Sequence, residues 1–181
     1  MTLPVPILRN GATLVLGGAR SGKSRFAEGL IEASPLDPFY IATAGDPGGD
    51  GEMAARIDEH RARRGARWRD AEAPLDLCGA LDRHAQLGTA VLVDCLTLWL
   101  TNLMVADRDI SAECEALIET LFQERFSPMV LVSNEVGLGI VPDNAMARAF
   151  RDHAGRLHQS IAARAGDVYF VAAGLPLKLK G

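Results

Sequence analysis

The segment GGARSGKS, residues 17 to 24, has the residue types and spacing that bind phosphate groups. Its Gly17, Gly22, Lys23 and Ser24 match the pattern G-x-x-x-x-G-K-[ST]. In such a loop the backbone amides surround phosphate oxygens at a helix N-terminus, the lysine adds positive charge, and the serine hydroxyl reaches Mg²⁺. A glycine-rich turn that only caps a helix is the alternative, but the chain has just two other lysines, which makes a chance lysine here a poor explanation. The predicted nucleotide-binding residues of this loop are Gly17, Gly18, Ala19, Arg20, Ser21, Gly22, Lys23 and Ser24.

Two carboxylates follow apolar runs that have the character of buried strands. Asp94 ends AVLVD, and open α/β sheets bind ligands at the edge where their strands end. There Asp94 would hold Mg²⁺ together with Ser24, directly or through water. The alternative is that Asp94 caps the next helix at Thr97. Glu135, in VSNEVGLGIVPDN, follows another such run and is a candidate base or metal contact.

A histidine flanked by arginines lies in RIDEHRARR, residues 56 to 64. Arg56 and Arg64 lie one helical turn on either side of His60, and Arg61 and Arg63 follow it closely. This positive charge could clamp a triphosphate, and it would also keep the imidazole neutral, as a nucleophile requires. On periodicity alone, His60 is more simply a core or boundary residue, and the arginines a solvated helix face partly neutralised by acidic neighbours.

These groups need a framework, and the apolar pattern predicts one. Runs of apolar and β-branched residues recur near positions 13, 39, 90, 129 and 167, with helix-length segments between them. Because the runs are continuously apolar rather than alternating, they predict parallel strands covered on both faces. The fold class is therefore α/β, as a single domain over residues 1–181.

Two of the intervening segments show apolar stripes at helical spacing. The stripe in residues 110–126 is Cys114, Leu117, Ile118, Leu121 and Phe122. The stripe in residues 144–166 is Met146, Phe150, His153, Leu157 and Ile161. We expect both helices to cover the sheet.

Composition narrows the function classes. The chain has 181 residues, 48% of them hydrophobic, and a formal net charge of −4, which gives no basic surface for nonspecific binding of nucleic acid. Its three cysteines form no metal-ligand spacing, and no stretch has the length and continuity of a membrane span. A cytoplasmic protein with reduced cysteines is expected.

The ordered motifs resemble one family, the bifunctional adenosylcobinamide kinases and adenosylcobinamide-phosphate guanylyltransferases of cobalamin biosynthesis. The resemblance runs from about residue 12 to the C-terminus. The motifs that carry it are GGARSGKSRFAE, YIATA, RIDEHRARR, WRDAEAP, VLVDCLTLWLTN, SNEVGLGIVPDN and FRDHAGR.

This resemblance implies a RecA-like phosphate-loop NTPase fold and a two-step enzyme with Mg²⁺ as cofactor. The enzyme would phosphorylate adenosylcobinamide with ATP or GTP and then transfer GMP from GTP to adenosylcobinamide phosphate through a covalent GMP adduct of His60. Lys23 and Glu135 complete the expected catalytic set. A homotrimer is also implied. The further nucleotide contacts carried over are Ala42, Thr43, Ala44, Arg61, Ala62, Arg63, Arg64, Glu72 and Asp94, among which Glu72 could read guanine N–H groups.

Two other functions remain open on the sequence. A phosphate-loop kinase of small molecules would use the arginines as a lid and His60 structurally, without a covalent nucleotide. A nonenzymatic nucleotide-dependent switch or assembly ATPase subunit would bind nucleotide and ignore corrinoids.

Overall fold

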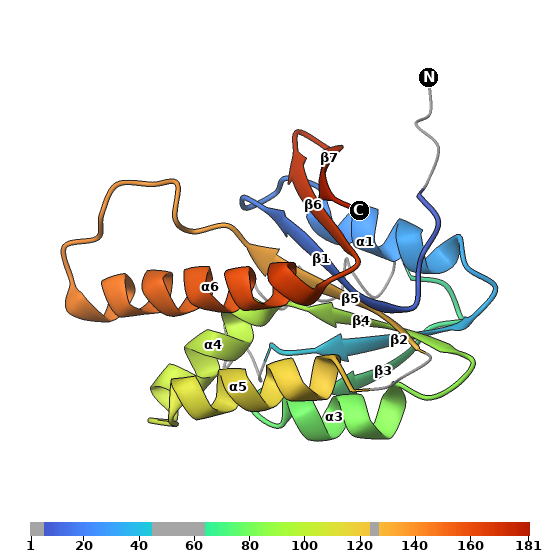
Figure 1. Cartoon of the computed structure of the whole chain (residues 1–181), viewed down its shortest axis with the longest axis horizontal. Coiled ribbons are helices and arrows are strands. Elements are labelled where there is room, and N and C mark those ends of the chain that lie inside the picture. The colour runs from blue at the N-terminus through green and yellow to red at the C-terminus, as the bar shows by residue number, and fades with distance from the viewer. Residues whose placement is uncertain (1–5, 45–63, 124–126) are drawn as a thin grey trace.

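Seven strands form one sheet in the order β3-β2-β4-β5-β1-β6-β7 (Figure 1). The structure is a computed structural model and describes residues 6–44, 64–123 and 127–181. All neighbouring strands are parallel except β6 and β7, which pair antiparallel. The strands are β1 (Gly11–Gly17), β2 (Asp37–Ala42), β3 (Arg69–Glu72), β4 (Thr89–Asp94), β5 (Pro128–Asn134), β6 (Asp167–Ala172) and β7 (Leu175–Lys180).

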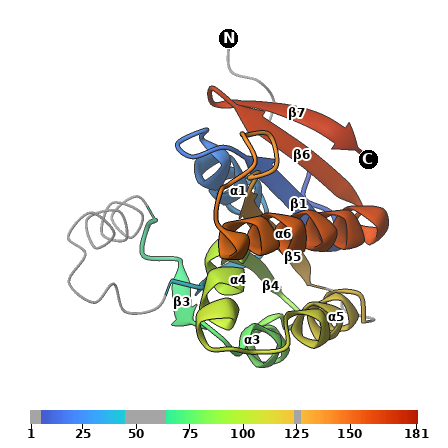
Figure 2. The same cartoon turned by 90° about the vertical axis from the view of Figure 1, so that its left-hand side faces the viewer.

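Helices cover both faces of this sheet, as the continuously apolar strands require. In Figures 1 and 2, α1 lies on one face, and α3, α4, α5 and α6 lie on the other. The core is divided in the same way, since Leu14 of β1 packs toward the larger helical layer and Val15 toward α1. The helices are α1 (Lys23–Glu32), α3 (Leu77–His84), α4 (Leu96–Val105), α5 (Ile110–Leu121) and α6 (Ala145–Arg164). The predicted α/β phosphate-loop NTPase fold is confirmed.

All five predicted strands are present, but the prediction missed β3 and β7. Both lie at an edge of the sheet. The sequence of β3, RDAE, is polar because three of its four residues are exposed. The sequence of β7, LPLKLK, alternates apolar and polar residues, yet Leu175, Leu177 and Leu179 are all largely exposed. Edge strands lack the two-sided burial on which the prediction depended.

The helix stripes are confirmed for α5 and partly for α6. In α5 all five predicted residues belong to the core or pack against it. In α6 the same holds for Phe150, Leu157 and Ile161, but Met146 is 55% exposed and the prediction for it was wrong. Met146 lies in the first turn of a helix of 20 residues, which extends beyond the end of the sheet (Figure 1). The fully covered histidine of α6 is His158, rather than the half-buried His153.

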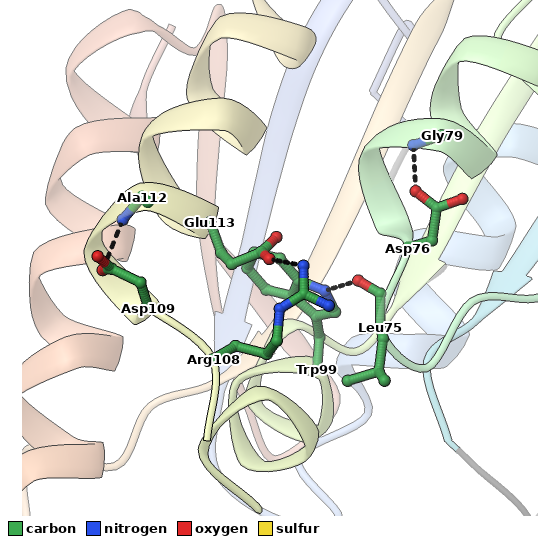
Figure 3. Close-up of polar contacts among 8 residues, drawn as sticks. All are labelled: Leu75, Asp76, Gly79, Trp99, Arg108, Asp109, Ala112 and Glu113. Carbon is green, nitrogen blue, oxygen red and sulfur yellow. Dashed lines mark hydrogen bonds and ion pairs between the residues drawn. The ribbon is translucent and has the colours of Figure 1, made fainter. Parts of the chain in front are cut away.

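Local sequence fixes where α3 and α5 begin (Figure 3). Asp76 accepts a hydrogen bond from the Gly79 N–H at 3.0 Å, and Asp109 accepts one from the Ala112 N–H at 3.1 Å. Each side chain satisfies an amide that the helix itself leaves without a partner. Between these caps, the fully buried Trp99 of α4 donates from its indole N–H to the Leu75 carbonyl at 2.9 Å, which ties α4 to the segment before α3.

Within the described part of the chain, every helix is too short or too polar to serve as a membrane span.

Candidate functional site

The phosphate-binding motif forms the turn between β1 and α1, as predicted. Gly22 precedes the helix with φ of 94°, a left-handed conformation that glycine adopts without steric cost. The Ser21 N–H donates to the Gly18 carbonyl at 3.3 Å, and the Lys23 ammonium donates to the same carbonyl at 3.2 Å. Lys23 is buried, whereas Ala19 and Arg20 at the tip of the turn are exposed. The N-terminus of α1 thus follows directly on the end of β1, with the Lys23 ammonium held against the turn between them.

The turn between β6 and β7 supports this loop, which the sequence did not reveal. The Gly174 N–H donates to the Ser21 carbonyl at 2.8 Å. A Cβ atom added at Gly22 would lie 3.0 Å from the Gly174 Cα, and one added at Gly17 would lie 2.5 Å from the Val171 carbonyl oxygen. Glycine is therefore needed at Gly17 and Gly22 for packing as well as for phosphate access.

Three neighbouring strands bring further predicted residues to the same edge. Ala42 of β2 is in register with Asp94 of β4 on one side and with Glu72 of β3 on the other. Ala44 follows two residues later and is half-buried. Asp94 does not cap α4, because Cys95 occupies the N-cap position and no side chain of the described residues caps that helix. The capping alternative is therefore not supported by the geometry.

Thr43 holds the backbone that carries Asp94. Its hydroxyl donates to the Cys95 carbonyl at 2.7 Å and accepts from the Cys95 N–H at 2.8 Å. Its own N–H donates to the Asp94 carbonyl at 3.1 Å. The Asn102 amide donates in turn to the Thr43 carbonyl at 2.8 Å. Because Thr43 is fully buried, these hydrogen bonds are shielded from water and fix the position of Asp94.

Asn134 is a site residue that sequence reasoning missed. It ends β5, the strand between β4 and β1, and it is in register with Gly17. Its amide donates to the Thr97 hydroxyl at 2.9 Å. A polar residue ends β5 just as Asp94 ends β4, and that shared position was the available signal.

Glu135 follows directly and links the phosphate loop to α6. Its N–H donates to the Gly17 carbonyl at 3.1 Å, and its carboxylate accepts from the Gly137 N–H at 2.6 Å. The other carboxylate oxygen lies 3.9 Å from Nδ1 of His158, whose Nε2 is 2.7 Å from the Ser133 hydroxyl. Burial lowers the pKa of His158 although the nearby Glu135 opposes that shift, so a neutral imidazole faces the carboxylate at neutral pH.

Part of the predicted site lies outside the described residues, namely His60, Arg61, Ala62 and Arg63. Arg64 is described, and its guanidinium carbon lies 3.4 Å from the centroid of the Tyr40 ring. Burial, with the Asp94 carboxylate adding to it, raises the pKa of Tyr40, so this ring stays protonated beneath the arginine. Arg64 therefore enters the described region on the face of the sheet that α1 covers.

The donor set suits Mg²⁺. The serine hydroxyl of Ser24 and the carboxylate of Asp94 are oxygen ligands of the kind Mg²⁺ takes. The described residues contain no cluster of three or more His, Cys, Asp or Glu side chains suited to a metal.

Comparison with known proteins agrees with this arrangement. Residues 13–179 match the family described as cobinamide kinase / cobinamide phosphate guanyltransferase. The bifunctional adenosylcobalamin biosynthesis protein CobP of Pseudomonas aeruginosa is 55% identical, covering 93% of this chain and 96% of that protein. The bifunctional adenosylcobalamin biosynthesis protein CobU of Salmonella typhimurium is 43% identical, covering 92% and 98%.

Solved structures show the fold alone at low identity. The protein PH0250 from Pyrococcus horikoshii OT3 superposes with a TM-score of 0.58 at 9% identity, over 97% of this chain and 89% of that one. The flagellar accessory protein FlaH from Methanocaldococcus jannaschii gives 0.50 at 11% identity, over 96% and 80%. With the phosphate loop, the carboxylate edge and nearly the whole length matched, this chain belongs to the cobinamide kinase / cobinamide phosphate guanyltransferase family.

Proposed function

We propose that this protein phosphorylates adenosylcobinamide and then transfers GMP onto the product, giving adenosylcobinamide-GDP. The observation that carries the proposal is the family match over residues 13–179, which spans both the phosphate loop and the arginine-flanked His60. The described geometry supports it, since the phosphate loop, Asp94 and Glu72 share one edge of the sheet.

In the kinase step, the hydroxyl oxygen of the aminopropanol arm attacks the γ-phosphorus of ATP or GTP, and the nucleoside diphosphate leaves. Lys23 and the amides of residues 17–24 hold the β and γ phosphates. Ser24 and Asp94 would hold Mg²⁺, which neutralises charge on the phosphates. Glu135 is the candidate acceptor of the hydroxyl proton. One oxygen of its carboxylate accepts from the Gly137 N–H, and the other lies 3.9 Å from His158 Nδ1.

In the transfer step, a ring nitrogen of His60 attacks the α-phosphorus of GTP and pyrophosphate leaves. A phosphate oxygen of adenosylcobinamide phosphate then attacks the same phosphorus, and the nitrogen–phosphorus bond breaks. This two-step transfer requires the imidazole of His60 to be neutral when it attacks. The proposed contacts to the nucleotide are Arg61, Ala62, Arg63 and Arg64. Glu72, exposed at the end of β3, is the proposed contact to guanine.

The test is covalent labelling. The whole protein is incubated with Mg²⁺ and α-labelled GTP, denatured, and examined for label. We expect an adduct that is acid-labile and alkali-stable, absent in His60→Ala and retained in His153→Ala, a matched control on α6. Label from γ-labelled GTP should not remain on the protein. If GTP binds and no label forms, the result favours the kinase without nucleotidyl transfer.

The assembly is proposed on the resemblance, and the location on the cysteine content and apolar pattern of the sequence. We place the enzyme in the cytoplasm as a homotrimer, and light scattering of the purified protein measures its mass directly. A nonenzymatic switch is the weaker alternative, because both relatives compared above are named as bifunctional biosynthesis proteins.

A further inference from the structure

The loop that follows β5 projects apolar side chains into solvent. Between Glu135 and Asn144, Leu138 is 82% exposed, Ile140 is 97% exposed and Val141 is 55% exposed. Single exposed apolar residues are common on protein surfaces, but three within four positions form a continuous apolar tip. We call residues 138–141 the apolar tip. In Figures 1 and 2 the loop, drawn in orange, arches over the start of α6.

The apolar tip is held by hydrogen bonds at both ends of its loop. At the first end, Glu135 bonds to the Gly17 carbonyl and to the Gly137 N–H. At the second end, the Arg148 guanidinium donates to the Pro142 carbonyl at 2.9 Å and to the Asp143 carbonyl at 2.6 Å. The Asn144 side chain caps α6 through the Ala147 N–H at 2.7 Å. Exposure of the tip is therefore a feature of an anchored loop, and the first end of that loop, at Glu135, lies beside Gly17 of the phosphate loop.

An open groove of about 600 Å³ lies between this loop and α6. Glycines 137, 139 and 155 line it together with Arg151, Arg156 and Gln159. A Cβ added at Gly155 would meet nothing within 4 Å, so the groove is open above this helix position. Its volume is in the range that small-molecule sites occupy. The groove thus combines glycine positions with hydrogen-bond donors and one carboxylate, that of Asp152, next to the apolar Val141.

We propose that the apolar tip and this groove bind the corrin ring of the acceptor substrate. A corrin ring has broad apolar faces and a rim of amide side chains. The apolar faces match Leu138, Ile140 and Val141, while the amide carbonyls match the N–H donors of Arg151, Arg156 and Gln159. The anchor at Gly17 lets a ring bound here extend its aminopropanol arm toward the phosphate loop. This inference rests on the proposed function, because a corrinoid is the acceptor in both steps.

A second copy of the chain is the other possible occupant of the tip. The groove argues against it, because among the described residues Arg151 and Asp152 pair only with each other, at 3.8 Å, and burying Arg156 against protein would require a further partner for its charge. A corrinoid rim that stays partly in water imposes no such requirement.

The test compares binding of adenosylcobinamide to the whole protein and to two variants. Ile140→Asp places a charge on the apolar tip. Gly155→Leu fills the groove at a helix position that has room for a side chain. Leucine also favours helix more than glycine does, so the helix itself should not be weakened. Leu87→Asp is the control, because Leu87 is 84% exposed in the turn before β4, at the opposite edge of the sheet. Equilibrium dialysis gives the corrinoid affinity, titration with GTP gives the nucleotide affinity, and light scattering gives the mass.

We expect Ile140→Asp and Gly155→Leu each to weaken adenosylcobinamide binding about 10-fold or more, with GTP affinity and mass unchanged and Leu87→Asp like the wild type. Wild-type corrinoid affinity in both variants would overturn the inference. A variant that changes mass while keeping corrinoid affinity would also overturn it, in favour of an interface between copies. If the wild type neither binds nor phosphorylates adenosylcobinamide, the proposed function fails first.

Discussion

The edge of the sheet where β4 and β5 end, which we call the nucleotide edge, differs from the loop that follows β5 in how its polar groups are used. At the nucleotide edge, Thr43, Thr97 and Asn134 bond to backbone or to one another within a buried network. The loop after Glu135 is bonded only near its ends and presents its apolar tip to water. The contrast follows the chemistry expected of each ligand. A triphosphate with Mg²⁺ needs charges held at fixed positions, whereas a large ring needs surface area.

The largest effect should come from Lys23→Ala, which removes the buried charge of the phosphate loop. We expect both the kinase rate and the yield of GMP adduct to fall at least about 100-fold, because charge on the transferred groups loses a fixed partner. Steady-state kinase assays and α-labelled GTP measure the two activities.

Lys180→Ala is the matched control. The Lys180 ammonium donates to the carbonyls of Ala162 and Ala163, so it also bonds backbone, but at the far end of α6. Its loss should leave both activities within about 2-fold of wild type, since surface contacts of this kind contribute little. Near-normal turnover in Lys23→Ala would show that the nucleotide edge does not work as a phosphate site.

The next effect tests the rigidity of the nucleotide edge. Thr43→Val keeps the shape of the side chain and leaves the N–H and carbonyl of Cys95 without the hydroxyl. We expect the free energy of unfolding to fall by about 2–4 kcal/mol, because two buried backbone groups lose their partner. Urea denaturation measures the change.

Thr101→Val serves as the comparison. The Thr101 hydroxyl donates to the Thr97 carbonyl at 3.0 Å on the exposed side of α4. Water can replace that bond, so the loss should stay within about 0.5 kcal/mol. Equal losses in both variants would mean that the buried network has no special role.

The sequence predicts the features of this contrast that have a local signal, namely a motif of fixed spacing or a continuously apolar strand. The phosphate loop and Asp94 were placed correctly, because a fixed motif and a continuously apolar strand are local signals. The roles of Thr43 and Gly174 in bracing that edge were not predicted. Thr43 bonds to Cys95 from 52 positions away, and Gly174 reaches Ser21 only through the final antiparallel pair.

The exposure of the apolar tip and the burial of His158 were not predicted, for a different reason. The run GLGIV, residues 137–141, has the composition of a loop that leads into a strand, so its exposure could not be predicted. That exposure depends on hydrogen bonds at the two ends of the loop, to Gly17, which is distant in sequence, and from the polar side chain of Arg148. On α6 the predicted apolar stripe included His153, but His158, the next histidine of the helix, is the one that contacts the Ser133 hydroxyl. One-dimensional periodicity does not identify which strand residue faces a helix.

His158 connects the two regions, and its titration gives the third prediction. Burial lowers its pKa in the folded state below the unfolded value of about 6.5. The unfolded chain therefore takes up a proton first as pH falls, and the folded state loses stability below about pH 6.5. Above that pH His158 is neutral in both the folded and the unfolded state, so its burial causes no loss of stability.

We expect unfolding free energy to fall by no more than about 1.4 kcal/mol per pH unit from this one proton. Urea denaturation between pH 7.5 and pH 5 should show a shallower fall in His158→Gln than in wild type. His153→Gln removes a histidine from the same helix without touching Ser133 or Glu135, and it should follow the wild-type curve. Parallel curves for all three proteins would remove His158 from the account of pH dependence.

The smallest effect sharpens the contrast from the side of the apolar tip. Arg148→Ala removes the two bonds to Pro142 and Asp143 but leaves the anchor at Glu135. Because Arg148 is exposed, the free energy of unfolding should change by less than about 0.5 kcal/mol. Arg83→Ala, which breaks the exposed ion pair with Asp76, is the control and should change it by a similarly small amount. We expect the KM for adenosylcobinamide to rise about 2- to 5-fold in Arg148→Ala alone, since a looser loop must be ordered on binding. The KM for GTP should not move in either variant. A rise for GTP as well would show that the loop positions the nucleotide too, and the two regions would then have to be treated as one site.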